Sequence, residues 1–97
     1  MKKILLTGGS GLLGTELQKH REYIAPSHSE MDITNFNSVK LFVDKHKPFL
    51  IVHAAAYTDV AKSDKEPEEM AKCYTSNVIG TRNIVKAAGG IPINYIS

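Results

Sequence analysis

The chain has 97 residues, of which 42% are apolar and 23% charged, and a formal net charge of +2. This length allows one domain at most, the composition is that of a globular protein, and so small a charge with scattered lysines argues against nucleic-acid binding. A single cysteine excludes an internal disulfide and a cysteine-rich metal site, and the apolar run after the first lysines is too short for a signal peptide or a membrane span. We therefore expect a cytosolic protein with no membrane contact and no metal.

Strands and helices are expected to alternate from the start of the chain. A short apolar run predicts a strand, buried on both faces, over Lys2–Thr7. Leucines at helical spacing then predict a helix from about Gly11 to Arg21. A second short strand is expected over Tyr23–Ala25, where Pro26 ends it, and a loop follows as far as Thr34.

The rest of the chain repeats this alternation. The expected elements are a helix capped by Thr34 or Asn35 and ended by Pro48, a strand over Phe49–Ala54, a long helix over Pro67–Ala88 and a strand over Ile91–Ser97. On the long helix, we expect one apolar face that carries Ala71, Tyr74, Val78, Val85 and Ala88. Alternation of this kind predicts a doubly wound α/β fold: a parallel sheet of about four strands in the order 2-1-3-4, with helices on both faces.

A glycine-rich turn joins the first strand to the first helix. Gly8, Gly11 and Gly14 have the spacing G-x-x-G-x-x-G, and Gly9 with the last two also satisfies G-x-G-x-x-G. Unpaired amides at a helix start attract anions, and glycines let a pyrophosphate approach the backbone. This position between strand and helix favours a dinucleotide site over a purely structural turn, and the missing Gly-Lys-Ser/Thr excludes a phosphate-loop NTPase.

The loop after the second strand bears on the choice of cofactor. It reads Ser27-His28-Ser29, with no acid before Glu30. A carboxylate at this place usually holds the ribose 2′-hydroxyl of NAD and repels a 2′-phosphate. We therefore favour NADP(H); NAD(H) stays the alternative, because Glu30 can fold back and the loop has no arginine.

Several further motifs occur in a familiar order. They are Gly8-Gly9-Ser10-Gly11-Leu12-Leu13-Gly14, Met31-Asp32-Ile33-Thr34, His53-Ala54-Ala55-Ala56-Tyr57-Thr58, Asn77-Val78-Ile79-Gly80-Thr81-Arg82-Asn83 and Tyr95-Ile96-Ser97. Together they resemble the extended short-chain dehydrogenases/reductases, and among these most of all the dTDP-4-dehydrorhamnose reductases. The resemblance implies that residues 1–97 are the amino-terminal, NAD(P)-binding Rossmann part of an incomplete domain, without the substrate domain.

The resemblance also implies which residues contact the cofactor. The residues along the pyrophosphate are Gly8, Ser10, Gly11, Leu12 and Leu13, and the residues at the adenine are Asp32 and Ile33. The residues at the end of the third strand, towards the nicotinamide, are Ala54, Ala55, Ala56 and Tyr57. The Asp32 carboxylate would accept from the adenine amine, although a turn-forming aspartate before a capped helix is the alternative. The alternative for the three alanines at the strand end is that they pack against a helix and do not contact a cofactor. Asn77 would support the site from the long helix.

The implied activity is NADPH-dependent reduction of the 4-keto group of a nucleotide sugar, dTDP-4-dehydro-L-rhamnose, in polysaccharide biosynthesis. The family uses a Tyr-x-x-x-Lys motif for proton transfer, and no tyrosine here has a lysine four residues later. We therefore expect no catalytic residue and a fragment inactive alone, whose last strand is an exposed edge able to pair with another copy. The alternatives are a non-catalytic regulatory protein of the same fold and a sugar-nucleotide epimerase or dehydratase.

Overall fold

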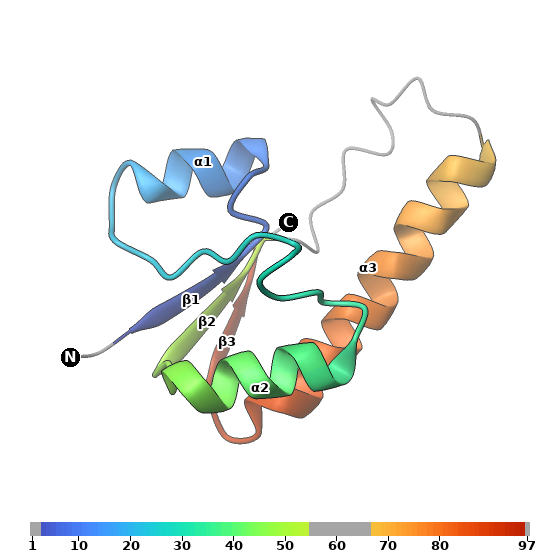
Figure 1. The fold of residues 1–97 in the computed structure, drawn as a ribbon. Helices are drawn as coiled ribbons and strands as arrows, with labels where there is room; N and C mark the ends of the chain where they lie inside the picture. The colour runs from blue at the N-terminus through green and yellow to red at the C-terminus, as the bar shows by residue number, and fades with distance from the viewer. Residues whose placement is uncertain (1–2, 55–66, 97) are drawn as a thin grey trace.

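The computed structural model describes residues 3–54 and 67–96, except for the side chains of residues 67–76. In chain order, the strands and helices are β1 (Ile4–Thr7), α1 (Leu12–Gln18), α2 (Phe36–His46), β2 (Leu50–His53), α3 (Pro67–Ala88) and β3 (Ile93–Tyr95). They alternate except between α1 and α2, where the expected second strand does not form (Figure 1). α1 lies on one side of the sheet, and α2 and α3 lie on the other. This arrangement confirms the doubly wound α/β fold.

The sheet is parallel throughout, with β2 between β1 and β3. The segment expected as the second strand is shorter than predicted. Only Ile24 pairs with β1, on the side away from β2: its N–H donates to the Ile4 carbonyl and its carbonyl accepts from the Leu6 N–H, each over 2.8 Å. The spatial order is therefore the predicted one, but Tyr23–Ala25 forms a bridge and not a strand, because Pro26 has no N–H to continue the ladder.

The ends of α2 follow from residues close in sequence. Asn35 is the N-cap, and its side-chain oxygen accepts from the Ser38 N–H over 3.3 Å. Lys47 ends the helix in a left-handed conformation, with φ of 46°. Its N–H donates to the Val43 carbonyl, which satisfies one of the carbonyls left open at the helix end.

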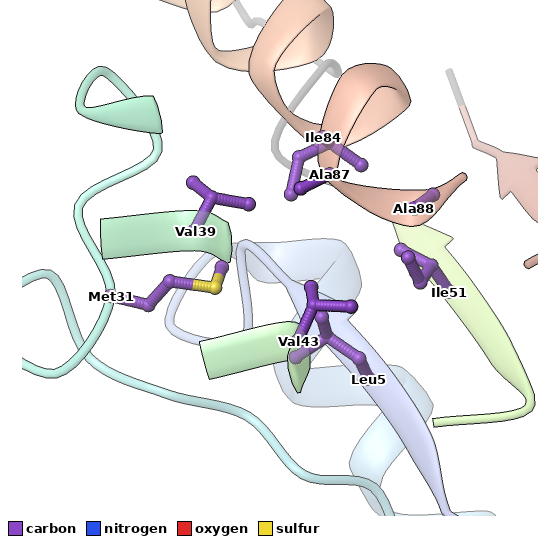
Figure 2. Close-up of a cluster of buried hydrophobic side chains, with 8 residues drawn as sticks. All are labelled: Leu5, Met31, Val39, Val43, Ile51, Ile84, Ala87 and Ala88. Carbon is purple, nitrogen blue, oxygen red and sulfur yellow. The ribbon is translucent and has the colours of Figure 1, made fainter. Parts of the chain in front are cut away.

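Side chains of the sheet are buried on both faces. Towards α2 and α3, Leu5 and Ile51 of the strands meet Val39 and Val43 of α2 and Ile84 of α3 (Figure 2). Towards α1, the strand residues Ile4, Leu6 and Val52 pack against Leu13 and Leu17. For this reason β1 and β2 begin with continuous apolar runs and show no period-2 alternation, whereas the edge strand β3 has two exposed residues, Asn94 and Tyr95.

The buried face of α3 differs from the predicted one. Val78 and Val85 are 42% and 45% exposed, whereas Ile84 and Ala87 are buried with Ala88. The buried face also includes Gly80 and the polar Asn83, which the spacing of apolar residues along the sequence does not predict. The other part of the predicted face, Ala71 and Tyr74, lies outside the described side chains.

β3 is an edge strand within the described residues, since it pairs with β2 alone. Its Tyr95 is 53% exposed. Pairing of this edge with a second copy stays a prediction. Among the helices in the described ranges, none combines the length and apolar character needed to cross a membrane.

Shortening one buried side chain tests the core between the sheet and the helices. Ile51→Val removes one methyl group from a side chain with no exposed surface, and we expect the free energy of unfolding to fall by about 0.5–1.5 kcal/mol. Ile79→Val is the matched control, because Ile79 is 40% exposed and its replacement should cost less than about 0.5 kcal/mol. Urea denaturation measures both, and equal losses would contradict this packing.

Candidate functional site

A groove of ≈ 600 Å³ opens where β1 ends. Its floor and walls come from five parts of the chain: Thr7 at the end of β1, the glycine turn, Gln18 of α1, the loop from Ala25 to Ile33, and Asn77 of α3. The carboxyl ends of parallel strands are where ligands bind in open α/β sheets. The groove is therefore the candidate site.

The glycine turn is fixed by a close contact with α1. A Cβ on Gly14 would stand 2.1 Å from the Gly8 carbonyl oxygen and 2.7 Å from the Gly9 Cα. Gly8 itself has φ of 74°, in the region that favours glycine. The protein thus requires glycine at both positions for its own backbone.

Gly11 differs from these two glycines. A Cβ there would meet only the Gly8 carbonyl oxygen, at an ordinary contact distance of 3.5 Å. Its backbone is extended (φ −76°, ψ 173°), a conformation that other residues adopt readily. Gly11 is also the N-cap of α1 and supplies no side-chain hydrogen bond. The fold does not need glycine here, and the missing side chain leaves open space at the start of the helix.

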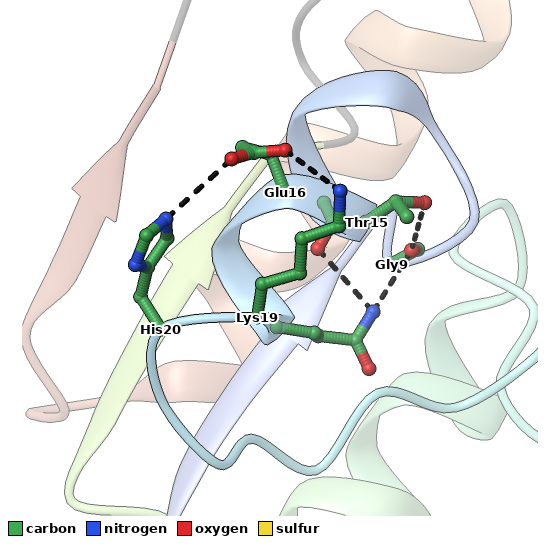
Figure 3. Close-up of polar contacts among 7 residues, drawn as sticks. Gly9, Thr15, Glu16, Lys19 and His20 are labelled. Atoms are coloured by element: carbon green, nitrogen blue, oxygen red, sulfur yellow. Dashed lines mark hydrogen bonds and ion pairs between the residues drawn. The ribbon is translucent and has the colours of Figure 1, made fainter.

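The turn is also held by side chains of α1, which the sequence analysis did not identify. Gln18 donates through Nε2 to the Gly9 carbonyl over 2.9 Å and to the Gly14 carbonyl over 3.3 Å. Thr15 donates through Oγ1 to the same Gly9 carbonyl over 3.4 Å (Figure 3). These bonds fix the peptide that begins the turn. A polar residue one turn after the last glycine is the signal that would have pointed to Gln18.

The loop that forms the opposite wall carries a carboxylate. Glu30 folds back, and its Oε1 accepts from the Ser27 N–H over 2.9 Å. Hydrogen bonds from Ser27 lower the pKa of Glu30, so that the group stays ionised. Ser27, His28 and Glu30 all line the groove. The wall therefore presents hydroxyl and imidazole groups together with one negative charge.

Asp32 and Ile33 occupy different places. The Asp32 carboxylate accepts from the Thr34 N–H over 3.0 Å and the Thr34 hydroxyl over 2.6 Å, and these bonds lower its pKa. Asp32 is thus the turn-forming aspartate that the sequence left as the alternative, and it does not line the groove. Ile33 does line it. The contact of Asp32 with an adenine stays a prediction.

A chain of hydrogen-bonded polar side chains, two buried and one half-buried, begins at Thr7 of the groove. Thr7 Oγ1 is 2.6 Å from His53 Nδ1, and His53 Nε2 is 2.9 Å from Thr81 Oγ1. His53 is fully buried, and burial lowers its pKa to about 4. A neutral imidazole offers one donor and one acceptor, which suits a hydroxyl on either side. The sequence analysis quoted His53 and Thr81 within motifs and assigned neither a role.

The remaining predicted residues divide into two groups. Ser10 and Leu12 are exposed around the start of α1, Leu13 is half-buried against the sheet, and Ala54 is buried directly after β2. Ala55, Ala56 and Tyr57 lie outside the described residues. The structure therefore brings Gly8, Gly9 and Ser10 of the glycine turn together with Ile33 around one groove, whereas Gly11, Leu12 and Leu13 are not among its lining residues. Of the residues predicted near the nicotinamide, only Ala54 is described.

Known proteins share this chain's sequence and fold. A protein-family model described as the RmlD substrate binding domain matches residues 1–97. The dTDP-4-dehydrorhamnose reductase of Aggregatibacter actinomycetemcomitans is 38% identical over 94 residues, which are 91% of this chain and 31% of that protein. The GDP-6-deoxy-D-talose 4-dehydrogenase of the same organism is 38% identical over 92 residues, 88% of this chain and 30% of that protein.

A solved structure agrees with these relatives. The dTDP-4-dehydrorhamnose reductase of Bacillus anthracis str. Ames, crystallised in complex with NADP, superposes with a TM-score of 0.75 at 31% identity. The match covers 91% of this chain and 32% of that one. The chain thus spans about a third of the length of each of these three proteins.

The buried histidine predicts a pH dependence of stability. The unfolded chain takes up a proton on His53 near pH 6.5, whereas the folded chain does so only near pH 4. The unfolded state therefore binds more protons in this window, and stability falls as pH drops through it, by about 3 kcal/mol in total. Urea denaturation at half-unit steps of pH measures this loss.

A variant isolates the contribution of that residue. His53→Gln keeps a donor and an acceptor between the two threonines, and its difference from the unmodified chain should shrink steadily between pH 6.5 and pH 4. The same replacement at the exposed His20 controls for removing a histidine elsewhere. Parallel pH profiles for the His53→Gln and unmodified chains would contradict the buried, neutral state.

Proposed function

Because this chain belongs to the RmlD substrate binding domain family, we propose that it forms the NADP(H)-binding part of a nucleotide-sugar reductase. The observation that carries the proposal is the open space at Gly11. The fold demands glycine at positions 8 and 14, but a Cβ at position 11 would meet nothing closer than 3.5 Å. A side chain there would stand at the start of α1, where helix amides attract a phosphate.

In this proposal, the cofactor's pyrophosphate docks on the glycine turn. Gly8, Ser10 and Gly11 approach it through their backbone, and Leu12 and Leu13 begin the helix whose amides receive the charge. Both leucines lie within the first turn of α1, which has no acidic residue. A carboxylate there would compete with the phosphate, so its absence supports the assignment.

The two ends of the cofactor extend from this turn. The adenine is proposed to lie against Ile33, which lines the groove, with Asp32 beside it. The nicotinamide is proposed to pass Ala54, Ala55, Ala56 and Tyr57. Small residues after β2 let a ring approach the backbone, as glycines do at the pyrophosphate.

When bound, NADPH supplies the hydride for reduction of a sugar 4-keto group, and dTDP-4-dehydro-L-rhamnose is the proposed substrate. The residues of this chain bind and orient the cofactor, and none is assigned as the proton donor. We propose that residues outside this chain hold the sugar nucleotide and transfer the proton, so that the chain alone does not reduce it. A purified chain that oxidises NADPH with this substrate would contradict that division of roles.

Replacing Gly11 tests the phosphate site without disturbing the fold. NADPH at about a hundred times its Kd should stabilise the unmodified chain by about 2.7 kcal/mol, which raises Tm by about ten degrees or more in a domain of this size. Gly11→Val should retain the Tm of the free chain and lose this shift, because its side chain occupies the phosphate position. Differential scanning fluorimetry measures both quantities.

Gly14→Ala provides the contrasting variant. Its methyl group would overlap the Gly8 carbonyl, so the Tm of the free chain should itself fall. An unchanged NADPH shift in Gly11→Val would place the phosphates elsewhere. No shift in the unmodified chain at millimolar NADPH would count against the cofactor assignment itself.

The carboxylate of the opposite wall should limit the preference for NADP(H). Glu30→Gln keeps an acceptor for the Ser27 N–H and removes a negative charge from the groove. We expect the Kd of NADPH to fall by about fivefold, because the repulsion between the carboxylate and the 2′-phosphate is removed, while the Kd of NADH changes little. Isothermal titration with both cofactors gives the ratio, and an equal change for the two would contradict this role.

A further inference from the structure

The face of α3 beneath the groove carries a glycine in the middle of a helix. Gly80 is buried there, although glycine in a helix interior is less favourable than alanine. No turn requires it, since α3 continues from Pro67 to Ala88. A neighbouring group must therefore need the space that a side chain would fill.

That neighbour is Ile33. A Cβ on Gly80 would stand 2.5 Å from Ile33 Cδ1, 2.9 Å from its Cγ1 and 3.2 Å from its Cβ. Rotation of the terminal methyl relieves only the first of these contacts. The Ile33 side chain therefore packs directly against the helix backbone at Gly80.

A second residue on the same face holds the backbone of Ile33. Asn83 is 9% exposed, and its Nδ2 donates to the Ile33 carbonyl over 2.8 Å. Gly80 and Asn83 are three residues apart and so lie on one side of α3. The side chain of Ile33 thus packs against the helix at Gly80, and the Ile33 carbonyl accepts a hydrogen bond from the helix at Asn83.

The loop around Ile33 is also held from the side of α2. The Asp32 N–H donates to Ser38 Oγ over 2.9 Å, and the Asp32 carbonyl accepts from the Asn35 N–H over 3.0 Å. The Asp32 carboxylate binds Thr34 on the other side of Ile33. A methyl group added at Gly80 therefore cannot be relieved by an easy movement of the loop, and it displaces Ile33 relative to the groove that Ile33 lines.

We propose that Gly80 and Asn83 are positioning residues that set where Ile33 stands in the groove and thereby control binding of the adenine-bearing end of the dinucleotide. The inference rests on the proposed function, because it takes the groove to be the cofactor site. It adds two residues of α3, neither of which lines the groove, to those that determine cofactor affinity.

A double-mutant cycle tests the proposal, with ADP and NADPH as the titrated ligands. Gly80→Ala should raise the Kd of ADP about tenfold, and it should also lower Tm, because the crowding against Ile33 outweighs the preference of a helix for alanine. In the Ile33→Ala background, where the crowded atoms are gone, Gly80→Ala should change the Kd of ADP by less than about twofold. A purely structural role would lower Tm and leave the Kd of ADP for the folded variant unchanged.

Gly90→Ala is the matched control, since a Cβ there has no atom within 4 Å, and it should leave both Kd values unchanged. If Gly80→Ala does not fold, Asn83→Leu serves in its place: it removes the donor to the Ile33 carbonyl without adding a group at Gly80, and it should also weaken ADP binding. An unchanged Kd in the folded variant, or an equal loss in both backgrounds, would overturn the proposal. An unmodified chain that binds neither ADP nor NADPH would instead refute the cofactor site, and this inference with it.

Discussion

The contact between α1 and the glycine turn is the constraint from which the candidate site is built. The helix starts so close to the end of β1 that a methyl group on Gly14 would overlap the Gly8 carbonyl. Gln18 then binds the Gly9 carbonyl from the next turn of the same helix. Because the backbone is fixed in this way, the start of α1 lies at the carboxyl end of β1, beside the loop that contributes Ile33 (Figure 1).

α3 is connected by hydrogen bonds to two separate parts of the groove. Through Thr81 and the buried His53 it reaches Thr7 at the end of β1. Through Asn83 it reaches the carbonyl of Ile33. Buried hydrogen bonds of this kind are costly to break, because an unpaired polar group in a low-dielectric interior loses the solvation it had in water. The walls of the groove are therefore connected by polar contacts inside an otherwise apolar core.

Two carboxylates in or beside the groove accept hydrogen bonds from residues of their own loop. The Glu30 carboxylate accepts from the Ser27 N–H, and the Asp32 carboxylate accepts from the N–H and the hydroxyl of Thr34. These bonds keep both carboxylates ionised, since hydrogen bonds to the charged form lower the pKa. The same loop thus combines turn geometry fixed by hydrogen bonds with negative charge, and it places Glu30 in the groove lining beside Ser27 and His28.

The sequence by itself determined most of the alternation of strands and helices, the glycine turn, a cap at Thr34 or Asn35 and the span of α3, because each of these depends on residues a few positions apart. It could not choose between the two uses of Asp32, and it extended Tyr23–Ala25 into a strand where one bridge forms. Tertiary structure alone decided the buried face of α3, the partners of His53 and the seat of Ile33 on Gly80. Those contacts join residues far apart in the chain, 46 positions for Thr7 and His53 and 50 for Ile33 and Asn83, and spacing along the sequence carries no information about which distant surfaces will meet.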